Sequence, residues 1–292
     1  MILVTGATGN TGRAVVRRLA AAGRPVRAMV RDPAQASQFG AGVEVVVADM
    51  TQSESLPAAV AGARQMLLIS PLDASMVELQ SRMAQTAANA GVQRIVKIST
   101  EIADPVSDAL IGQWHGLSEQ AVERTGVAFC HLRPCNFMQN LQVFLPEIKA
   151  SNSFSAPLGD ARISLVDVED LAAVAAAVLM GDATPDAPIV VTGAHAPTYR
   201  EFADLLSQQL GRPIHYEATS MEEARQRFLA SGVAPWKTQE LIRMYAYLQD
   251  PDHTRCTDTV QRLTGQAPRS FADFVQAYAR QLLPNGAPHG RD

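Results

Sequence analysis

A glycine-rich turn near the start constrains this sequence more than any other feature. The apolar run Ile2–Thr5 is typical of a strand, and three glycines follow it in the pattern G-x-x-G-x-x-G. A helical segment near Thr11–Ala22 comes directly afterwards. Glycines permit a tight turn, and the free N–H groups of a helix N-terminus attract phosphate. This order predicts a site for the pyrophosphate of a dinucleotide, with a glycine turn that binds no ligand as the alternative. The residues expected to bind the cofactor here are Gly6, Thr8, Gly9, Asn10, Thr11 and Gly12.

Short β-branched runs alternate with alanine-rich helical segments through the first half of the chain. Continuous apolar strands separated by helices indicate a parallel sheet that is covered on both faces. Right-handed crossovers then predict an α/β, Rossmann-type doubly wound fold. The expected strands are Ile2–Thr5, Val26–Val30, Val43–Val47, Gln65–Ser70, Arg94–Ser99 and Val127–Leu132. The expected helices lie near Thr11–Ala22, Gln52–Ala61, Ser75–Ala90 and Gln113–Thr125.

The second half of the chain predicts a smaller, mostly helical C-terminal substrate region. We expect a dinucleotide-binding domain over residues 1–150, with a strand and a helix added from about 160–192. A substrate-covering region over 193–283 and a flexible tail over 284–292 complete the expected organisation. Thr198 and Ser220 each stand three residues before a Glu, a spacing typical of a capping box at a helix start. The further expected elements are Asp167–Met180, Ile189–Thr192, Pro213–Glu217, Pro235–Leu248 and Phe271–Leu283. The crevice between the two regions is the expected substrate site.

The composition excludes several classes of protein. The chain is 47% hydrophobic and 18% charged, with a net charge of −4, so it lacks the basic balance of a nucleic-acid binder. No apolar run reaches the roughly 20 residues that a membrane helix needs. Its 3 cysteines do not form a disulfide framework. The sequence contains no H-x-x-x-H or C-x-x-C pair that would suggest a metal site. We expect a soluble cytoplasmic protein, monomer or homodimer, that binds a small molecule and neither nucleic acid nor membrane.

The side chains after the second strand bear on the choice between NADP and NAD. The residue that meets the adenosine ribose is expected about 20 residues beyond the glycines, where Arg31 and Asp32 stand. An Arg can fork onto a 2′-phosphate, whereas an Asp would bind the free 2′-hydroxyl of NAD. Because Arg31 comes first, we expect NADP(H), with NAD(H), or a solvated Arg31–Asp32 pair, as the alternatives. Contacts to the adenine and nicotinamide ends are expected from Asp49, Met50 and Ser70.

The tyrosine–lysine pair of ordinary short-chain dehydrogenases is missing from this sequence. Four residues before Lys97, Lys149 and Lys237 stand Gln93, Leu145 and Val233. Carbonyl reduction that uses such a Tyr as its acid is therefore excluded. An isomerase or epimerase of nucleotide-linked sugars is disfavoured for the same reason.

Five motifs make the sequence resemble the NmrA-like, atypical short-chain dehydrogenase/reductase family over roughly residues 1–283. They are Thr5–Gly12, Val30–Pro33, His115-x-x-x-Glu119, Leu132–Pro134 with Asn136-Phe137, and Val166–Ala172. The third motif, in place of Tyr-x-x-x-Lys, resembles the quinone oxidoreductase, triphenylmethane reductase and azoreductase-type members. The resemblance implies NADPH and hydride transfer to a planar, electron-poor acceptor, such as a quinone, an imine or iminium, or a dye. Other members bind dinucleotide as redox-sensing regulators without turnover, and this is the alternative function.

Such acceptors suit a site that lacks the usual acid. A quinone, an iminium or a triarylmethyl cation accepts hydride without simultaneous protonation, so the protein supplies mainly orientation and a dry pocket. His115 and Glu119 lie one helical turn apart on one face. We expect His115 to donate to the substrate and Glu119 to hold the imidazole; an inert surface pair or a packed His is the alternative.

Further site residues are expected from strand ends and from the C-terminal half. Ser99 ends the fifth strand and is expected to hydrogen-bond the nicotinamide ribose or the substrate. The expected substrate-binding residues are Asn136, Phe137, Met138 and Trp236. Phe137 and Met138 could stack on a planar acceptor, but core packing explains them equally well.

Overall fold

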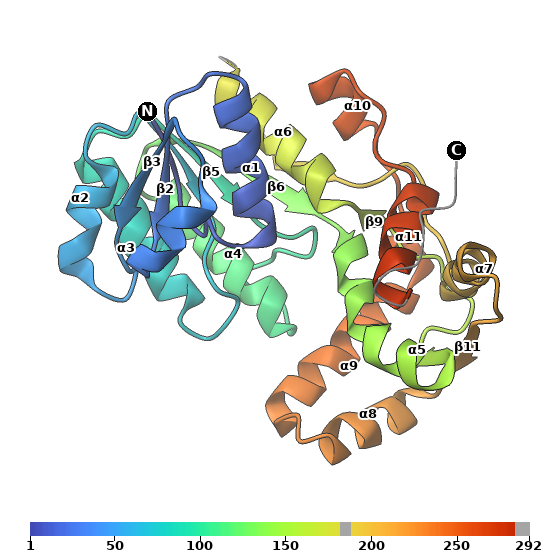
Figure 1. Ribbon diagram of the computed structural model, residues 1–292. Coiled ribbons are helices and arrows are strands. Elements are labelled where there is room, and N and C mark those ends of the chain that lie inside the picture. The colour runs from blue at the N-terminus through green and yellow to red at the C-terminus, as the bar shows by residue number, and fades with distance from the viewer. Residues whose placement is uncertain (182–187, 284–292) are drawn as a thin grey trace. The chain divides into compact units, whose positions relative to one another are not determined.

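The computed structural model describes residues 1–181 and 188–283, and the chain divides into two compact units (Figure 1). Unit 1 comprises Met1–Cys135, Val168–Thr192 and Thr257–Ala267. Unit 2 comprises Asn136–Asp167, Gly193–Cys256 and the chain from Pro268 onward. The chain thus first passes from unit 1 to unit 2 after Cys135, earlier than the expected boundary at 150. The reason is that the segment after Cys135 buries its apolar side chains in the core of unit 2. The expected tail over 284–292 lies outside the described residues.

Unit 1 is built on a parallel sheet whose seven strands, among the described residues, run in the order β10-β6-β5-β4-β1-β2-β3. Every ladder between neighbouring strands is parallel. The strand order reverses at β1, which lies between β2 and β4, so the predicted doubly wound fold is confirmed. The strands are β1 (Ile2–Val4), β2 (Val26–Val30), β3 (Val43–Val47), β4 (Gln65–Leu68), β5 (Arg94–Ile98), β6 (Ala128–Pro134) and β10 (Ile189–Val191).

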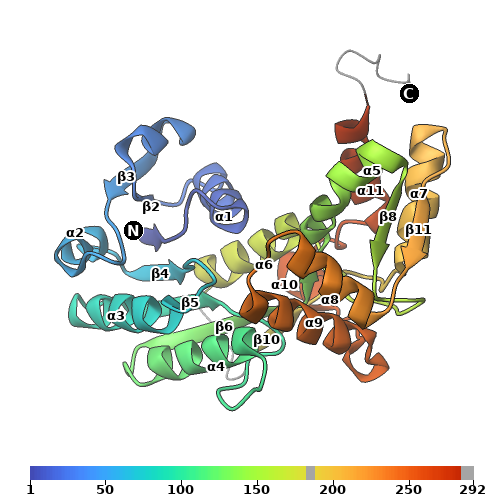
Figure 2. The ribbon, with the colours of Figure 1, turned by 90° about the horizontal axis from the view of Figure 1, so that it is seen from below.

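Helices cover both faces of this sheet. Figure 2 shows α3 and α4 on one side of β4, β5 and β6, with α6 on the other. Helix α1 packs on α6, and α2 packs on α3. Strands covered on both sides must be apolar throughout, which explains the continuous burial of β1 and of most of β4 and β5. The helices of unit 1 are α1 (Asn10–Ala21), α2 (Leu56–Val60), α3 (Met76–Asn89), α4 (Leu110–Glu123), α6 (Val168–Met180) and α10 (Thr259–Thr264), with short 3-10 turns η1 (Pro33–Gln38) and η2 (Ser53–Ser55).

Unit 2 is mainly helical around an aromatic core. Phe154 lies at its centre, with ring centroids 4.9 Å from Phe144 and 5.4 Å from Phe202. Both predicted capping boxes are confirmed, because Thr198 and Ser220 each accept from the backbone of a Glu three residues later. The helices of unit 2 are α5 (Leu145–Ser151), α7 (Tyr199–Leu210), α8 (Met221–Ala230), α9 (Pro235–Gln249) and α11 (Phe271–Ala279), with 3-10 turns η3 (Met138–Phe144), η4 (Pro251–His253) and η5 (Arg280–Leu282). Its strand pairs are β8 (Ser153–Ala156) with β11 (His215–Ala218), and β7 (Asn136–Phe137) with β9 (Leu165–Val166).

No helix among the described residues combines the length and the apolarity that crossing a membrane requires.

Candidate functional site

The glycine turn joins β1 to α1 at the carboxyl edge of the sheet in unit 1. The buried Thr5 ties this turn to β4, since its hydroxyl both donates to the carbonyl and accepts from the N–H of Ile69 at 2.8 Å. Gly6 has a φ of +58°, a conformation that favours glycine, and its carbonyl accepts from the N–H of Gly9 at 3.0 Å. Helix α1 then begins without a side-chain cap and without an acid in its first turn. Its first N–H groups and positive dipole are thus suited to an anionic ligand.

Gly12 allows the first turn of α1 to lie directly against the glycine turn. A Cβ at this position would stand 2.2 Å from the Gly6 carbonyl oxygen and 2.9 Å from Ala7 Cα. Both neighbours are backbone atoms of the turn itself, so they cannot rotate away as a side chain could. The glycine is therefore a geometric requirement of the turn.

The Asp32 side chain is engaged in local hydrogen bonds, whereas the Arg31 side chain is not. The Asp32 carboxylate accepts from the N–H of Ala34 at 2.9 Å and forms a capping box with Gln35 at the start of η1. Within the described residues, the side chain of the exposed Arg31 makes no hydrogen bond or ion pair. Its guanidinium is thus available to a ligand, while the carboxylate that would mark NAD is held in a cap.

The other expected cofactor residues lie at the ends of β3 and β4. The Asp49 carboxylate accepts from the N–H and the hydroxyl of Thr51, both at 2.9 Å. The N–H of Thr51 is the main reason that the pKa of Asp49 is lowered, and the charge of Arg31 acts in the same direction. Met50 is buried, and the Ser70 hydroxyl accepts from the Gln80 amide at 2.9 Å.

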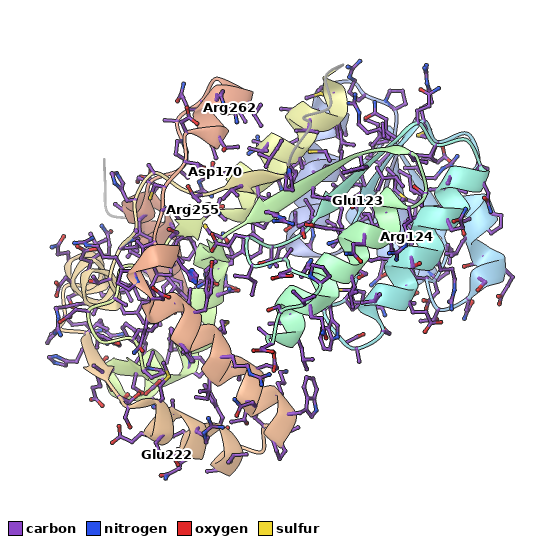
Figure 3. All side chains as sticks on the ribbon, turned by 180° about the vertical axis from the view of Figure 1, so that it is seen from behind. Glu123, Arg124, Asp170, Glu222, Arg255 and Arg262 are labelled. Atoms are coloured by element: carbon purple, nitrogen blue, oxygen red, sulfur yellow. The ribbon has the colours of Figure 1, made fainter. Side chains whose placement is uncertain are left out.

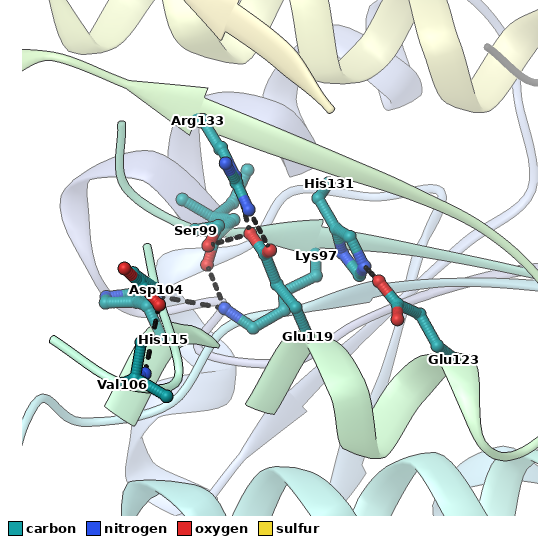
Figure 4. A network of polar contacts seen from close by, with 10 residues as sticks. Lys97, Ser99, Asp104, Val106, His115, Glu119, Glu123, His131 and Arg133 are labelled. Atoms are coloured by element: carbon teal, nitrogen blue, oxygen red, sulfur yellow. Dashed lines mark hydrogen bonds and ion pairs between the residues drawn. The ribbon is translucent and has the colours of Figure 1, made fainter. Parts of the chain in front are cut away.

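A mostly buried polar cluster lies between β5, β6 and α4 (Figure 4). Side chains two apart in a strand share a face, and side chains four apart in a helix share a side. Register aligns Lys97 of β5 directly with His131 of β6. The cluster consists of Lys97 and Ser99 from β5 and its end, His131 and Arg133 from β6, and His115, Glu119 and Glu123 from α4.

Glu119 holds two side chains of this cluster together. Its carboxylate accepts from the Ser99 hydroxyl at 2.5 Å and from Arg133 Nε at 3.0 Å, and a second Arg133 nitrogen contacts its other oxygen. Burial alone would raise the pKa of Glu119, but the hydrogen bonds from Arg133 and Ser99 lower it overall. The carboxylate is therefore ionised at neutral pH.

His115 has a different partner from the one expected. Its Nδ1 lies 2.9 Å from Lys97 Nζ, while the oxygens of Glu119 bind Ser99 and Arg133. The spacing of His115 and Glu119 correctly places them on one side of α4, but it does not show what the facing strands present. Lys97 is the residue that sequence reasoning missed, and a Lys inside the apolar run Ile95–Ile98 was the available signal.

His131 is a second buried polar group that the sequence reasoning overlooked. Its Nε2 lies 3.1 Å from a Glu123 oxygen, and Nδ1 has no hydrogen-bond partner among the described residues. Figure 3 labels Glu123 beside Arg124 at the C-terminal end of α4. Burial lowers the pKa of His131, while the charge of Glu119 acts in the opposite direction.

Two glycines bring α4 close to the segment that follows β5. A Cβ on Gly116 would lie 2.3 Å from the backbone nitrogen of Pro105, and one on Gly112 would lie 2.6 Å from the Ile102 carbonyl oxygen. Their spacing of four residues places both on one side of the helix, which is the signal that the sequence offered. This close approach sets the position of His115, which α4 carries between them.

The expected substrate residues all belong to unit 2. Met138 is 2% exposed and lies in the apolar core of that unit, so core packing, the alternative for this residue, is what the structure shows. Asn136 and Phe137 form the half-buried strand β7, and the Asn136 side-chain oxygen accepts from Asn140 at 2.5 Å. Trp236 stands in the first turn of α9 and is 56% exposed. Within the described ranges, no group of three or more His, Cys, Asp or Glu side chains is arranged to hold a metal ion.

The fold and the glycine turn define a dinucleotide-binding protein of the Rossmann type. The model of the NmrA-like family matches residues 1–261, so this chain belongs to the NmrA-like family. The predicted resemblance is thereby confirmed. The class of NAD(P)H-dependent reductase is confirmed by the similar proteins that follow.

Several characterised proteins are similar over nearly their full length. The NAD(P)H azoreductase of Xenophilus azovorans is 36% identical over 281 residues, 96% of this chain and 98% of its own. The (4-alkanoyl-5-oxo-2,5-dihydrofuran-3-yl)methyl phosphate reductase of Streptomyces griseus is also 36% identical, over 97% of this chain and 100% of its own. The crystal structure of the NADPH-dependent quinone oxidoreductase QOR2 of Escherichia coli complexed with NADPH is 25% identical, with a TM-score of 0.86 and coverage of 95% of this chain and 99% of that one. The predicted cofactor, NADP(H), agrees with that complex.

Proposed function

We propose that this protein is an NADPH-dependent reductase that transfers hydride to a planar, electron-poor organic acceptor such as a quinone, an imine or iminium, or a dye. The observation that carries the proposal combines two features. The glycine turn leads into helix α1, which has no side-chain cap, and the side chain of Arg31 lacks a partner among the described residues while Asp32 caps η1. The named relatives, an azoreductase and a quinone oxidoreductase among them, support this class of acceptor.

The residues of unit 1 fit the dinucleotide. Gly6, Gly9 and Gly12 would admit the pyrophosphate against the N-terminus of α1, with Thr8, Asn10 and Thr11 beside it. Arg31 would bind the 2′-phosphate, Asp49 and Met50 would meet the adenine, and Ser70 would border the nicotinamide. When bound, the cofactor supplies the hydride, and the chain orients it and excludes water.

The polar cluster suits an acceptor that needs little acid catalysis. His115 replaces the missing Tyr as the proton donor, and Ser99, fixed by Glu119, positions the nicotinamide ribose or the substrate. Burial, together with the charges of Lys97 and Arg133, lowers the pKa of His115 well below its ordinary value. The ring is therefore neutral and can donate only one proton, which favours acceptors that are already electrophilic.

Steady turnover distinguishes this reductase from a redox-sensing regulator of the same family. NADPH oxidation is followed against quinones, iminium compounds and cationic dyes, with NADH in parallel. We expect turnover with NADPH on at least one acceptor class. Tight NADPH binding without turnover on any acceptor would instead support the regulator.

Arg31→Gln is expected to raise the KM for NADPH by roughly 10- to 100-fold, because a charged hydrogen-bonded pair with phosphate contributes about 1.5–3 kcal/mol. The KM for NADH should change little, since NADH carries no 2′-phosphate. Arg124→Gln, an equal change at an exposed Arg at the end of α4, is the matched control. Equal losses with NADPH and NADH would contradict the assignment of Arg31.

A further inference from the structure

Lys97 is a fully buried lysine whose charge is not neutralised by direct contact. Its side chain is 0% exposed in the middle of the sheet, where lysine is rarely found. Within the described part of the chain, Nζ makes hydrogen bonds to the Ile98 carbonyl oxygen at 3.3 Å and to His115 Nδ1 at 2.9 Å. Both partners are uncharged acceptors, so no carboxylate contacts the ammonium group.

Charged and titratable groups of the cluster around Lys97 come from α4, β6 and the segment after β5, whereas its neighbour on β4 is the apolar Leu68. Glu119 favours the ammonium form, but its oxygens are bound to Ser99 and Arg133. Arg133 opposes the ammonium form, and burial opposes it most. The titratable and charged groups of this cluster are His115, Glu119 and Glu123 on α4, His131 and Arg133 on β6, and Asp104 after β5.

The balance of these effects makes the ammonium proton labile. Burial lowers the pKa of Lys97 to about 7, so the side chain can lose and regain a proton near neutrality. An ammonium group has no lone pair, so it can only donate to His115 Nδ1. The neutral imidazole then carries its own proton on Nε2.

We infer that Lys97 is the proton reservoir of the site and recharges His115 after each turnover on acceptors that become anions. The inference rests on the proposed function, in which His115 donates to the acceptor. A neutral acceptor that has gained hydride (two electrons and one proton) becomes an anion and takes the Nε2 proton of His115. Nδ1 takes a proton from Lys97 at the same time, which restores a neutral imidazole and leaves a neutral amine. Water then protonates Nε2 and the Nδ1 proton returns to the amine, which restores the ammonium group and an imidazole protonated on Nε2. The dinucleotide leaves oxidised.

The relay separates acceptors by their charge. A neutral quinone needs one proton after it receives hydride, whereas a cationic triphenylmethane dye becomes neutral by hydride addition alone. Loss of the Lys97 proton should therefore slow quinone reduction and affect dye reduction far less. Lys97→Met preserves the length of the side chain and removes the proton, so it is the informative variant.

The first experiment compares kcat for menadione and for crystal violet, a triphenylmethane dye that stays cationic across the range, as pH is varied at saturating NADPH. In the unsubstituted enzyme, we expect quinone turnover to fall as pH rises through about 7, and dye turnover to lack that transition. In Lys97→Met, the ratio of quinone kcat to dye kcat should fall by about 30-fold, within the usual range for general acid catalysis, and the transition should disappear. An unchanged ratio overturns the inference. A quinone profile without a transition in the unsubstituted enzyme also overturns it, and this second result does not depend on whether the variant folds.

The second experiment needs no cofactor. In the protein labelled with ¹⁵N-histidine, the ring nitrogens of His115, assigned with His115→Gln, should report a neutral ring protonated on Nε2. Their shifts should move with a midpoint of about 7 as Lys97 titrates, and Lys97→Met should abolish this midpoint. A ring that shows no such midpoint overturns the inference while leaving the proposed function intact. Absence of turnover on every acceptor overturns both.

Discussion

Gly12→Ala is expected to raise the Kd for NADPH by about 100-fold and to lower the thermal stability of the protein. The added Cβ would stand 2.2 Å from the Gly6 carbonyl oxygen, so α1 or the glycine turn must shift. Overpacking of this kind costs roughly 1–3 kcal/mol, and about 2.8 kcal/mol corresponds to 100-fold in affinity. The shift falls on the backbone N–H groups that would bind the pyrophosphate, so affinity suffers most. Isothermal titration with NADPH and a thermal melt of the free protein measure the two effects.

Two other glycines provide controls for that result. Gly40→Ala makes the same chemical change where no atom lies within 4 Å and φ is not positive, so both readouts should stay unchanged. At Gly9 the nearest atom to a Cβ is the Gly6 carbonyl oxygen at 3.4 Å, so Gly9→Ala should fold normally. If the phosphate approaches this backbone, Gly9→Ala will still weaken NADPH binding. A Gly12→Ala protein with normal affinity would contradict the role given to the turn.

Patterns that act locally were sufficient to predict most of the fold. The strands Val26–Val30 and Val43–Val47 are found with the expected bounds, because both are rich in valine, a β-branched residue that favours strands, although the second lies partly exposed at the edge of the sheet. The capping boxes at Thr198 and Ser220 were equally local signals. The short elements β7, β8, α5 and α10 were not expected. They form through contacts with distant segments, such as the pairing of β8 with β11, which no short sequence window contains.

The candidate site divides along the same line. Glycine spacing and the position of Arg31 depend on neighbours in the chain, so the cofactor loop could be predicted. The partner of His115 depends on the register between β5 and the helix that covers it, and the sequence showed only that Glu119 lies on the same side of α4. Met138 was expected to bind the substrate but lies in the core of unit 2. An apolar side chain after a strand suits a pocket and a core equally, so the sequence could not decide between them. Side-chain partners across elements are thus the part that required the structure.

Glu119→Gln is expected to lower the free energy of unfolding at neutral pH by about 3 kcal/mol, since removing one partner of a buried ion pair leaves the other uncompensated. The lower end of the range of 3–5 kcal/mol applies because the Arg133 side chain is 24% exposed. Glu119 itself is 4% exposed, and an amide in its place puts a donor against the Arg133 guanidinium. Urea unfolding should show the loss, with a melting temperature lower by roughly 5–10 °C. Glu78→Gln removes a carboxylate that is 71% exposed and paired to Arg82 four residues later, so it should cost less than about 0.5 kcal/mol.

The pH dependence of this difference identifies its electrostatic origin. The pKa of Glu119 is lowered from 4.5 in the folded protein, so the folded state binds fewer protons than the unfolded state in that range. Its contribution is therefore fully present above pH 4.5 and is lost as pH falls through the lowered value. The stability gap between the unsubstituted protein and Glu119→Gln should thus be constant from neutrality down to about pH 5 and should narrow below it. A gap that stays the same under acid conditions would show that Glu119 acts through its shape and packing, and that the Ser99–Glu119–Arg133 contacts contribute little as a charged network.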